Sequence, residues 1–410
     1  MEWLGTINLI YTISFLDLFA VGVFFPTFTQ HLRDLGASHT TIGLFTASYS
    51  AIQVLSGPLI GSWSDIRDRR TVLKCTLLLS FTCYFLLGTT NSIGILFFVR
   101  ILLAVFKHTQ SICKAVISDL IPIQDQSDVL AKSVSIGSCG FIIGPLVGGN
   151  LVELSNGFSY VSYFTALLFI LNYIIASYIP EDIKTKTSRQ QTMMTSDFTV
   201  WSTIKREFKK SVTEITEIDW SQHWQSFLLK FLLGVTMSCY FSNQGLYLRE
   251  TYQLSQKHTG YMISYFSVVS ILSGLFLKKI HAVLNFDNIY SKMCFWFGAL
   301  SLGFICLYCS TNLIVFIILL MPISMCAMAM RVISVEMMFE KSKALHAGSL
   351  SGASNSIMSV ARFVTPLFTG VTSDIFSEKS VMLIAALPAS LGLAVSLFIR
   401  QKERRCIKDE

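Results

Sequence analysis

The sequence is poor in charged residues. Asp, Glu, Lys and Arg make up only 14% of its 410 residues, whereas about a quarter of a soluble globular protein is charged. Hydrophobic residues make up 52%, which is more apolar surface than a water-soluble fold of this length can bury. The composition therefore excludes a soluble enzyme and a nucleic-acid-binding domain, and the net charge of +7 needs another explanation.

Other common signals are also missing. The polar segments contain no nucleophile–base set and no cluster of metal ligands, so we expect neither an enzyme nor a bound metal or other cofactor. The ten cysteines are irregularly spaced, and nearly all lie in apolar runs, which favours packing over a disulfide framework. The first apolar run has no signal-peptide cleavage site and is long enough to span a bilayer, so we expect it to be retained.

Long apolar runs are abundant, and each has roughly the 20 residues that a membrane helix needs. There are twelve, near 5–29, 41–62, 72–89, 93–116, 134–153, 158–179, 224–247, 259–280, 290–309, 313–335, 347–371 and 379–399. We therefore predict an all-α membrane protein with 12 transmembrane helices. Its predicted parts are a six-helix lobe at 1–179, a linker at 180–222, a second six-helix lobe at 223–400 and a tail at 401–410.

The positive charges are distributed unevenly between the loops. If the N-terminus is cytoplasmic, 21 of the 32 Lys and Arg lie in inside loops and the tail, and four lie in outside loops. The positive-inside rule then predicts that both termini are cytoplasmic. The loop charges do not distinguish a plasma membrane from an endolysosomal one. Within the linker, residues 198–218 place apolar residues and Lys or Arg at helical spacing, which predicts an amphipathic helix on the inner membrane surface.

The two halves of the chain are related by an internal duplication. Residues 43–57 resemble 260–274 at an offset of 217, and the same offset pairs 114–119 with 331–336. A third pair, 144–149 with 365–370, needs four extra residues. We predict two parallel six-helix repeats, an arrangement in which secondary transporters bind their substrate near the membrane midplane.

A charged loop follows the second apolar run. Gly61, Asp65, Arg69 and Arg70 resemble the G-x-x-x-D-R-x-G-R-R/K loop of the major facilitator superfamily, although Asp68 stands where that loop usually has glycine. Asp65 and the arginines are expected to form a cytoplasmic latch that holds helices together in one transport state. The alternative is that these cations only anchor the loop on the inner side of the membrane.

The fifth run is rich in glycine. Gly140, Gly144, Pro145, Gly148 and Gly149 resemble the G-x-x-x-G-P-x-x-G-G motif of the antiporters in this superfamily. Glycines at spacings of three and four share a helix face and permit close helix approach, and Pro145 permits bending. This seam favours exchange transport, although close packing alone is the other explanation.

Two charges lie deep in the predicted spans. Asp17 and Arg100 are similar to the membrane-embedded acid and arginine of tetracycline-type proton antiporters, and both are expected ~18 Å from the inner surface, where they could pair. Asp17 is the leading candidate for a proton carrier because it is the one acidic residue deep in a span, and His108 is the second. The alternative is a permanent Asp17–Arg100 structural lock.

A polar stripe is predicted on the fourth helix. On a continuous helix Lys107, Ser111 and Lys114 share one face with Arg100, which should line water and, being net positive, favours an anionic solute. Other polar or aromatic residues on cavity-type helices are as readily packing contacts as substrate contacts: Tyr49, Gln53, Tyr240, Asn243, Gln244, Tyr265 and Asn355. Arg362 is a further candidate cavity residue, which would favour an anionic solute if it faces inward.

The run from Phe106 to Thr109, followed by Ser118 to Leu120, resembles the orphan animal transporters of the major facilitator superfamily domain-containing protein 9 branch. These resemblances imply a monomeric secondary transporter that moves a small organic solute by alternating access, with proton-coupled antiport favoured. The alternatives are an organic-anion uniporter or symporter, and a non-transporting sensor or scaffold that uses 180–222 to bind a partner.

Overall fold

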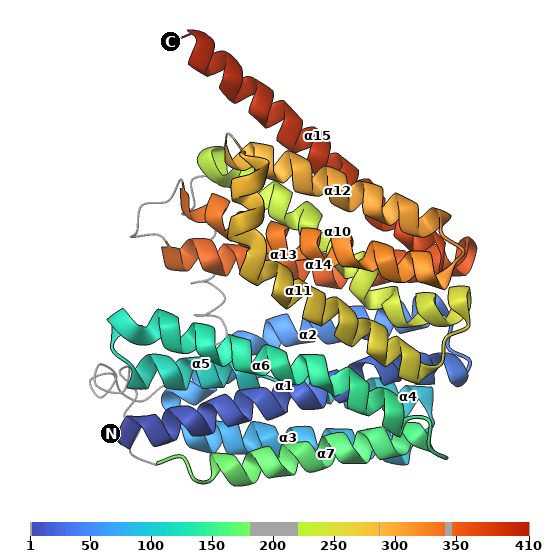
Figure 1. The fold of residues 1–410 in the computed structure, drawn as a ribbon. Helices are drawn as coiled ribbons and strands as arrows, with labels where there is room; N and C mark the ends of the chain where they lie inside the picture. The colour runs from blue at the N-terminus through green and yellow to red at the C-terminus, as the bar shows by residue number, and fades with distance from the viewer. Residues whose placement is uncertain (1, 181–219, 287, 341–346, 410) are drawn as a thin grey trace. The chain divides into compact units, whose positions relative to one another are not determined.

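The computed structural model describes residues 2–180, 220–286, 288–340 and 347–409 (Figure 1). Within these ranges the chain forms α-helices and no strand, as predicted. Nine helical stretches in the described part are long and apolar enough to cross a membrane. The other three long helices, α2, α10 and α14, are richer in Ser, Thr, Asn and Gln.

The helices follow the predicted runs closely. The first half contains α1 (Glu2–Asp34), α2 (His39–Ile66), α3 (Arg69–Thr89), α4 (Ile93–Phe106), α5 (Thr109–Leu120), α6 (Ile123–Leu151) and α7 (Gly157–Ala176). The second half contains α10 (Trp220–Tyr252), α11 (Gln256–Leu284), α12 (Ile289–Cys309), α13 (Leu313–Glu340), α14 (Ala347–Ile375) and α15 (Ser380–Asp409). Because α4 and α5 share one apolar stretch and count as one interrupted helix, each half of the described chain contains six long helices.

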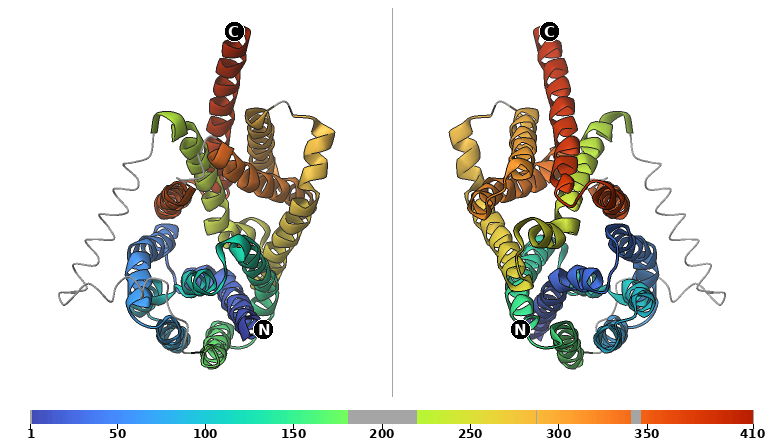
Figure 2. Two further views of the ribbon diagram at one scale, coloured as in Figure 1. Left: turned by 90° about the vertical axis from the view of Figure 1, so that its left-hand side faces the viewer. Right: turned by 90° about the vertical axis from the view of Figure 1, so that its right-hand side faces the viewer.

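Three predictions about the elements need comment. The fourth run is not one continuous helix, because it is broken between α4 and α5. The predicted tail at 401–410 continues α15 to Asp409, and this part of the helix extends away from its neighbours (Figure 2). The amphipathic helix predicted at 198–218 lies outside the described residues.

Contacts divide the chain into two compact units. Unit 1 contains 1–37, 48–210 and 255–264, and unit 2 contains 38–47, 211–254 and 265–410. The units therefore differ from the predicted lobes in two short segments. Residues 38–47, at the start of α2, belong to unit 2, and residues 255–264, at the start of α11, belong to unit 1.

Each unit has its own helix packing. In unit 1, α1 lies against α6 and α7, and α3 lies against α7. In unit 2, α12 contacts α13 and α15, while α10 contacts α14 and α15. The arrangement places α1 at the centre of unit 1, where its polar side chains are buried.

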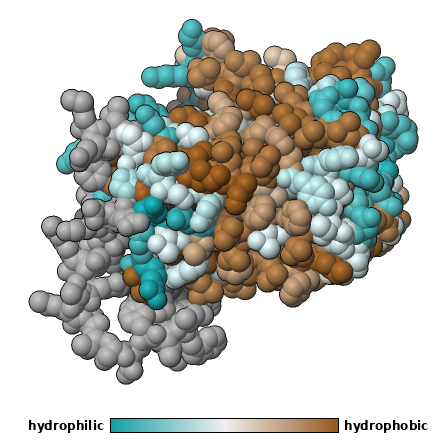
Figure 3. Space-filling model, turned by 90° about the horizontal axis from the view of Figure 1, so that it is seen from below, coloured by the Kyte–Doolittle hydropathy of each residue, from teal (hydrophilic) through white to brown (hydrophobic). Residues whose placement is uncertain are grey.

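The surface carries many apolar side chains. On the face shown in Figure 3 they form a broad belt between polar ends. The exposed apolar side chains include Phe85 of α3 and Leu167 and Ile174 of α7. Such a belt suits a hydrocarbon environment, in which apolar side chains face lipid and each helix satisfies its own backbone.

Candidate functional site: a buried ion pair at a broken helix

The fourth membrane span is interrupted at its middle. Lys107 (φ −78°, ψ 70°) and His108 (φ −122°, ψ 22°) leave the helical conformation between the end of α4 and the start of α5. The His108 amide donates to the Phe106 carbonyl at 2.8 Å, a contact two residues apart. A break of this kind frees backbone groups that must find other partners inside a membrane.

Helix α2 supplies those partners. Gln53 Nε2 donates to the Lys107 carbonyl at 3.1 Å, and Ser56 Oγ donates to the Ala104 carbonyl at 3.2 Å. Ser56 Oγ also lies 2.8 Å from His108 Nε2. The break is therefore held by specific side chains and is a built feature of unit 1. Gln53, expected as a cavity residue, holds the backbone of the break.

The break directs Lys107 onto Asp17. Lys107 Nζ forms an ion pair with Asp17 Oδ1, and the two side chains are only 6% and 1% exposed. Gln110 Nε2 donates to Asp17 Oδ2 at 3.0 Å and to the Ser14 carbonyl at 3.1 Å. Lys107 Nζ also lies 5.0 Å from the centre of the Phe169 ring. An isolated buried charge costs several kcal/mol, so each of these two charges depends on the other.

Arg100 occupies a different environment from the one predicted. Its guanidinium carbon lies 4.1 Å from the ring centre of Tyr49 and 4.9 Å from that of Phe28. The predicted Asp17–Arg100 pair is wrong, because the helix break brings Lys107 to Asp17 instead. The aromatic faces stabilise the Arg100 cation by cation–π interactions.

The predicted stripe on the fourth helix is also broken. It assumed a continuous helix, but Lys107 is buried whereas Ser111 and Lys114 are exposed on α5. His108 is buried, and its ring contacts Ser56. Ser111 and Lys114 therefore share a solvent-accessible face of α5 that does not include Lys107.

The charged loop forms the expected contact at the end of α2. Asp65 and Arg69 form an ion pair, and Arg69 Nε also donates to Asp119 Oδ2 of α5 at 3.0 Å. Arg69 is nearly buried in this cluster. Arg70 instead donates to the Ser177 carbonyl at 2.6 Å, and a side chain added at Gly61 would meet open space.

The unusual Asp68 has a clear structural role. Its carboxylate accepts from the Thr71 amide at 2.9 Å and from the Thr71 hydroxyl at 3.1 Å. It therefore caps the N-terminus of α3, a position at which Asp is preferred.

The glycine seam is a site of close contact between α6 and α1. A Cβ atom at Gly140 would lie 2.4 Å from the Phe15 carbonyl oxygen, and one at Gly148 would lie 2.1 Å from that of Val23. At Gly144 the nearest backbone atoms, in Gly22 and Phe19, would be 2.7 Å away. Larger residues are therefore excluded from this helix face.

The end of the seam meets the start of α11. A Cβ atom at Gly149 would lie 3.0 Å from Lys257 Cα, and one at Gly260 would lie 2.2 Å from the Pro145 carbonyl oxygen. These contacts lie within unit 1, to which residues 255–264 belong.

The candidates in unit 2 fall into two groups. Tyr240, Asn243 and Gln244 of α10 are buried, and Asn243 donates to the Thr369 hydroxyl at 2.9 Å. Asn243 therefore makes a contact between helices. Tyr265 is half-buried, whereas Asn355 and Arg362 of α14 are exposed.

Sequence reasoning missed three contributors: Ser56, Gln110 and Arg331. Gln110 follows Lys107 by three residues, a spacing that signals a shared helix face. The positive charge of Arg331 of α13 is disfavoured first by partial burial and then by the positive charge of Arg362. The sequence feature that could have identified Arg331 is the duplication, which pairs Arg331 with Lys114.

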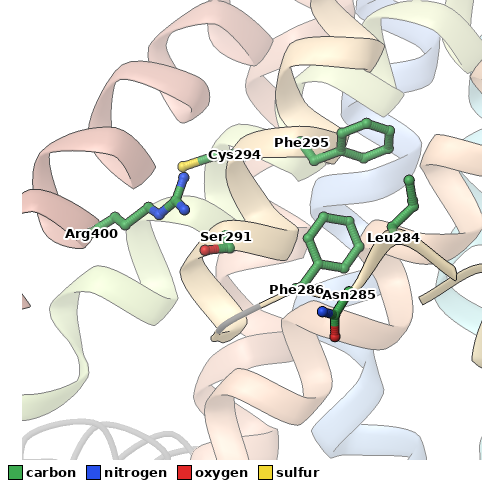
Figure 4. Close-up of a pocket in the computed structure, with 7 residues that line it drawn as sticks. All are labelled: Leu284, Asn285, Phe286, Ser291, Cys294, Phe295 and Arg400. Carbon is green, nitrogen blue, oxygen red and sulfur yellow. The ribbon is translucent and has the colours of Figure 1, made fainter. Parts of the chain in front are cut away.

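A separate pocket lies in unit 2 at the start of α12. Its lining includes Phe286, Cys294 and Arg400, and the Arg400 guanidinium points toward the Cys294 sulfur (Figure 4). None of the predicted site residues lines this pocket.

Comparisons with known proteins point to one family. The family model described as Major Facilitator Superfamily matches residues 9–366. The quinolone resistance protein NorA of Staphylococcus aureus is 22% identical over 409 residues, with 98% of each chain covered. The class E tetracycline resistance protein of Escherichia coli is 26% identical over 198 residues, which cover 46% of this chain and 49% of that protein.

The fold is also similar to that of solved transporters. The crystal structure of a bacterial homologue of the human lysosomal transporter Spinster matches with a TM-score of 0.75 at 12% identity, over 98% of this chain and 97% of that chain. The narrower resemblance to the domain-containing protein 9 branch stays a prediction.

Proposed function

The chain belongs to the major facilitator superfamily and is a multi-pass membrane transporter, and from this premise we propose that it exchanges a small organic solute for protons by alternating access. The observation that carries the proposal is the buried Asp17–Lys107 ion pair at the break between α4 and α5. The names of two relatives, which are drug resistance proteins, support the solute class.

Asp17 is the proposed proton carrier and Lys107 its charge partner. A proton on Asp17 removes the negative charge that stabilises Lys107, so the ammonium group must then find another partner or become solvated. Proton binding and rearrangement of the break are thus linked. A solute that binds one arrangement more tightly must change the proton affinity by the same factor by which the proton changes the affinity for the solute. His108 is the second candidate carrier.

The proposed orientation places both termini in the cytoplasm. The Asp65–Arg69–Asp119 cluster then lies on the cytoplasmic side, where it ties the end of α2 to the end of α5. We assign it the role of an inner latch, and we assign Gly144 and Pro145 the role of a flexible seam. The proposed transporter works as a monomer.

The test uses purified protein in liposomes. Quinolone and tetracycline are the probes, and a trapped pH dye reports solute-driven proton movement. Asp17→Asn should lower this movement at least tenfold, while Asp128→Asn, at an exposed acid of α6, should leave it unchanged. Exchange of labelled for unlabelled solute without a pH gradient checks that the variant still folds and binds. Wild-type proton movement by Asp17→Asn would refute the proton role.

A second candidate is transport of an organic anion by uniport or symport. The positive charges of Arg331 and Arg362 in unit 2 disfavour each other, and neither forms an ion pair within the described residues. Two neighbouring guanidinium groups suit a carboxylate or phosphate.

The anion candidate is tested with radiolabelled p-aminohippurate. Arg362→Gln should lower uptake at least tenfold, Arg362→Lys should lower it less, and Lys279→Gln, at an exposed cation of α11, should not change it. Equal uptake by Arg362→Gln and wild type would remove this candidate. A partner-binding role for 180–222 falls almost entirely outside the described residues.

A further inference from the structure

The starts of α2 and α11 are built alike. Asp374 accepts from the His39 amide at 2.9 Å and the Thr40 amide at 2.8 Å, so it caps α2 from the end of α14. Glu153, at the end of α6, accepts from Ser255 Oγ at 3.1 Å at the start of α11. The two acids are 221 residues apart, which is the offset that also relates the glycine motifs of α6 and α14.

A second contact repeats as well. A Cβ atom at Gly43 would lie 2.2 Å from the Pro366 carbonyl oxygen, and one at Gly260 would lie 2.2 Å from that of Pro145. The duplicated halves therefore share one way of holding the start of a helix. A side chain that is present at the start of α2 but not at the start of α11 is therefore not needed for these shared contacts.

One start carries a titratable cluster that the other lacks. His39 is 5% exposed, and its Nδ1 lies 3.1 Å from Glu378 Oε2 while its Nε2 lies 3.3 Å from Glu250 Oε1. At the offset of 217, the residue equivalent to His39 is Gln256 and the residue equivalent to Glu250 is Arg33. The triad of His39, Glu250 and Glu378 is thus an addition to the frame, and it lies within unit 2.

The triad is arranged to hold a proton. A neutral imidazole donates through one nitrogen only, so it can satisfy one of the two carboxylates. A protonated imidazole is positively charged and carries an N–H group on both nitrogens, so it can compensate Glu250 and Glu378 together; the Nδ1–Glu378 contact has an ion-pair distance without hydrogen-bond geometry. Glu378 has a side chain only 1% exposed, and a buried carboxylate without a charged partner is costly. Burial opposes the imidazolium form, whereas the two carboxylates favour it.

Two further charged groups near His39, Asp374 and Lys379, make contacts of their own. Asp374 faces the backbone of His39 and Thr40, and Lys379, next to Glu378, places its Nζ 5.7 Å from the centre of the Tyr308 ring. Burial raises the pKa of Asp374, but hydrogen bonds from Thr40 and from the His39 amide outweigh it and hold this pKa below its ordinary value. The Asp374 cap therefore stays ionised between pH 5 and about pH 8.

We propose that His39, Glu250 and Glu378 form a second proton-binding site, and that loss of its proton loosens the start of α2 within unit 2. The site is distinct from Asp17, and the proposal does not depend on transport being coupled to protons. An imidazole titrates near neutral pH, so this site senses the pH range in which Asp374 does not change.

Hydrogen exchange of the full-length protein in nanodiscs tests the proposal. Amide exchange of residues 39–47 is followed from pH 5 to pH 8 and corrected for the intrinsic effect of pH on exchange. Wild type should lose at least tenfold protection as pH rises. His39→Gln, which installs the residue of the equivalent start, should show no pH-dependent change. His258→Gln is the matched control, because His258 is exposed near the start of α11, and it should behave as wild type.

Glu378→Gln provides an independent variant. It removes one carboxylate that favours the protonated imidazole, so the midpoint of the protection change should move down by about one pH unit. Unchanged protection in α12 confirms that each variant is folded. Flat protection in wild type, or a wild-type profile in His39→Gln, would overturn the proposal.

Discussion

A carboxylate and an ammonium group face each other inside unit 1, and removal of either one leaves the other in apolar surroundings. Asp17 and Lys107 come from α1 and from the break after α4, so their contact fixes these two elements together. Breaking a buried ion pair costs about 3–5 kcal/mol, whereas replacing both partners with neutral groups is often nearly neutral.

We predict a clear non-additivity at this pair. Asp17→Asn and Lys107→Met should each lower the free energy of unfolding by about 3–5 kcal/mol. The double variant should recover most of that loss, because it leaves no unpaired charge. Thermal unfolding in detergent measures all four proteins, and a double variant whose loss equals the sum of the single losses would contradict the ion-pair assignment.

The partners of the broken backbone can be tested at Gln53. Gln53→Leu leaves the Lys107 carbonyl without this donor, so we expect a loss of about 1–3 kcal/mol. Ser138→Ala removes an exposed hydroxyl that bonds within its own helix, and it should change stability by less than about 0.5 kcal/mol. Equal melting temperatures for Gln53→Leu and Ser138→Ala would show that Gln53 is not needed.

At this scale the sequence identified one half of the site. Asp17 stands out because no other acid lies deep in a predicted span, and the structure buries it fully. Its partner could not be predicted, since Arg100 and Lys107 lie seven residues apart and share one face of a straight helix. The choice between them depends on the backbone at Lys107 and His108, which propensity does not reveal.

The close contact between α1 and α6 requires glycine in α6. Gly148 brings the two backbones so close that a methyl group would overlap Val23, whereas Gly61 on α2 faces open space. The same substitution should therefore have opposite effects at these two positions. Helical Gly to Ala is favourable by up to about 1 kcal/mol where there is room.

Gly148→Ala should lower the melting temperature by several degrees, and Gly61→Ala should leave it unchanged or raise it slightly. Both variants are compared by thermal unfolding, followed by solute exchange in liposomes. Normal stability of Gly148→Ala would mean that α1 and α6 can separate without cost.

The sequence predicted the positions of the helices, but it did not predict the break between α4 and α5. Apolar length located each span, and the spacing of Gly140, Gly144 and Gly148 indicated a close helix contact. The break after Phe106 contains neither Pro nor Gly, so no local residue announces it. It depends on Gln53 and Ser56 from another helix.

At the scale of the whole chain, duplication produced two similar units with different chemistry. At the offset of 217, Gly234 stands where unit 1 has Asp17, and Ser324 stands where it has Lys107. The buried ion pair therefore belongs to unit 1 alone, while the His39 cluster belongs to unit 2 alone. The repeats could be recognised in the sequence, but only the contacts in the structure show that Asp17 pairs with Lys107 and that His39 contacts two glutamates.

The proposed orientation predicts which loops a membrane-impermeant maleimide can reach. In a background from which all ten native cysteines are removed, a cysteine at Ser92 should be labelled from outside intact cells. A cysteine at Gln401 should be labelled only after the cells are permeabilised. The reverse pattern would place the termini outside.

Helix α5 joins the two charged clusters of unit 1. It starts next to Lys107, which is held by Asp17, and near its other end Asp119 contacts Arg69. A helix of 12 residues is ~18 Å long and bends little, so it acts as a lever whose two ends cannot shift independently. A displacement of Lys107 at the centre of unit 1 must therefore also move Asp119 relative to Arg69, so the ion pair is mechanically coupled to a cluster that it does not contact.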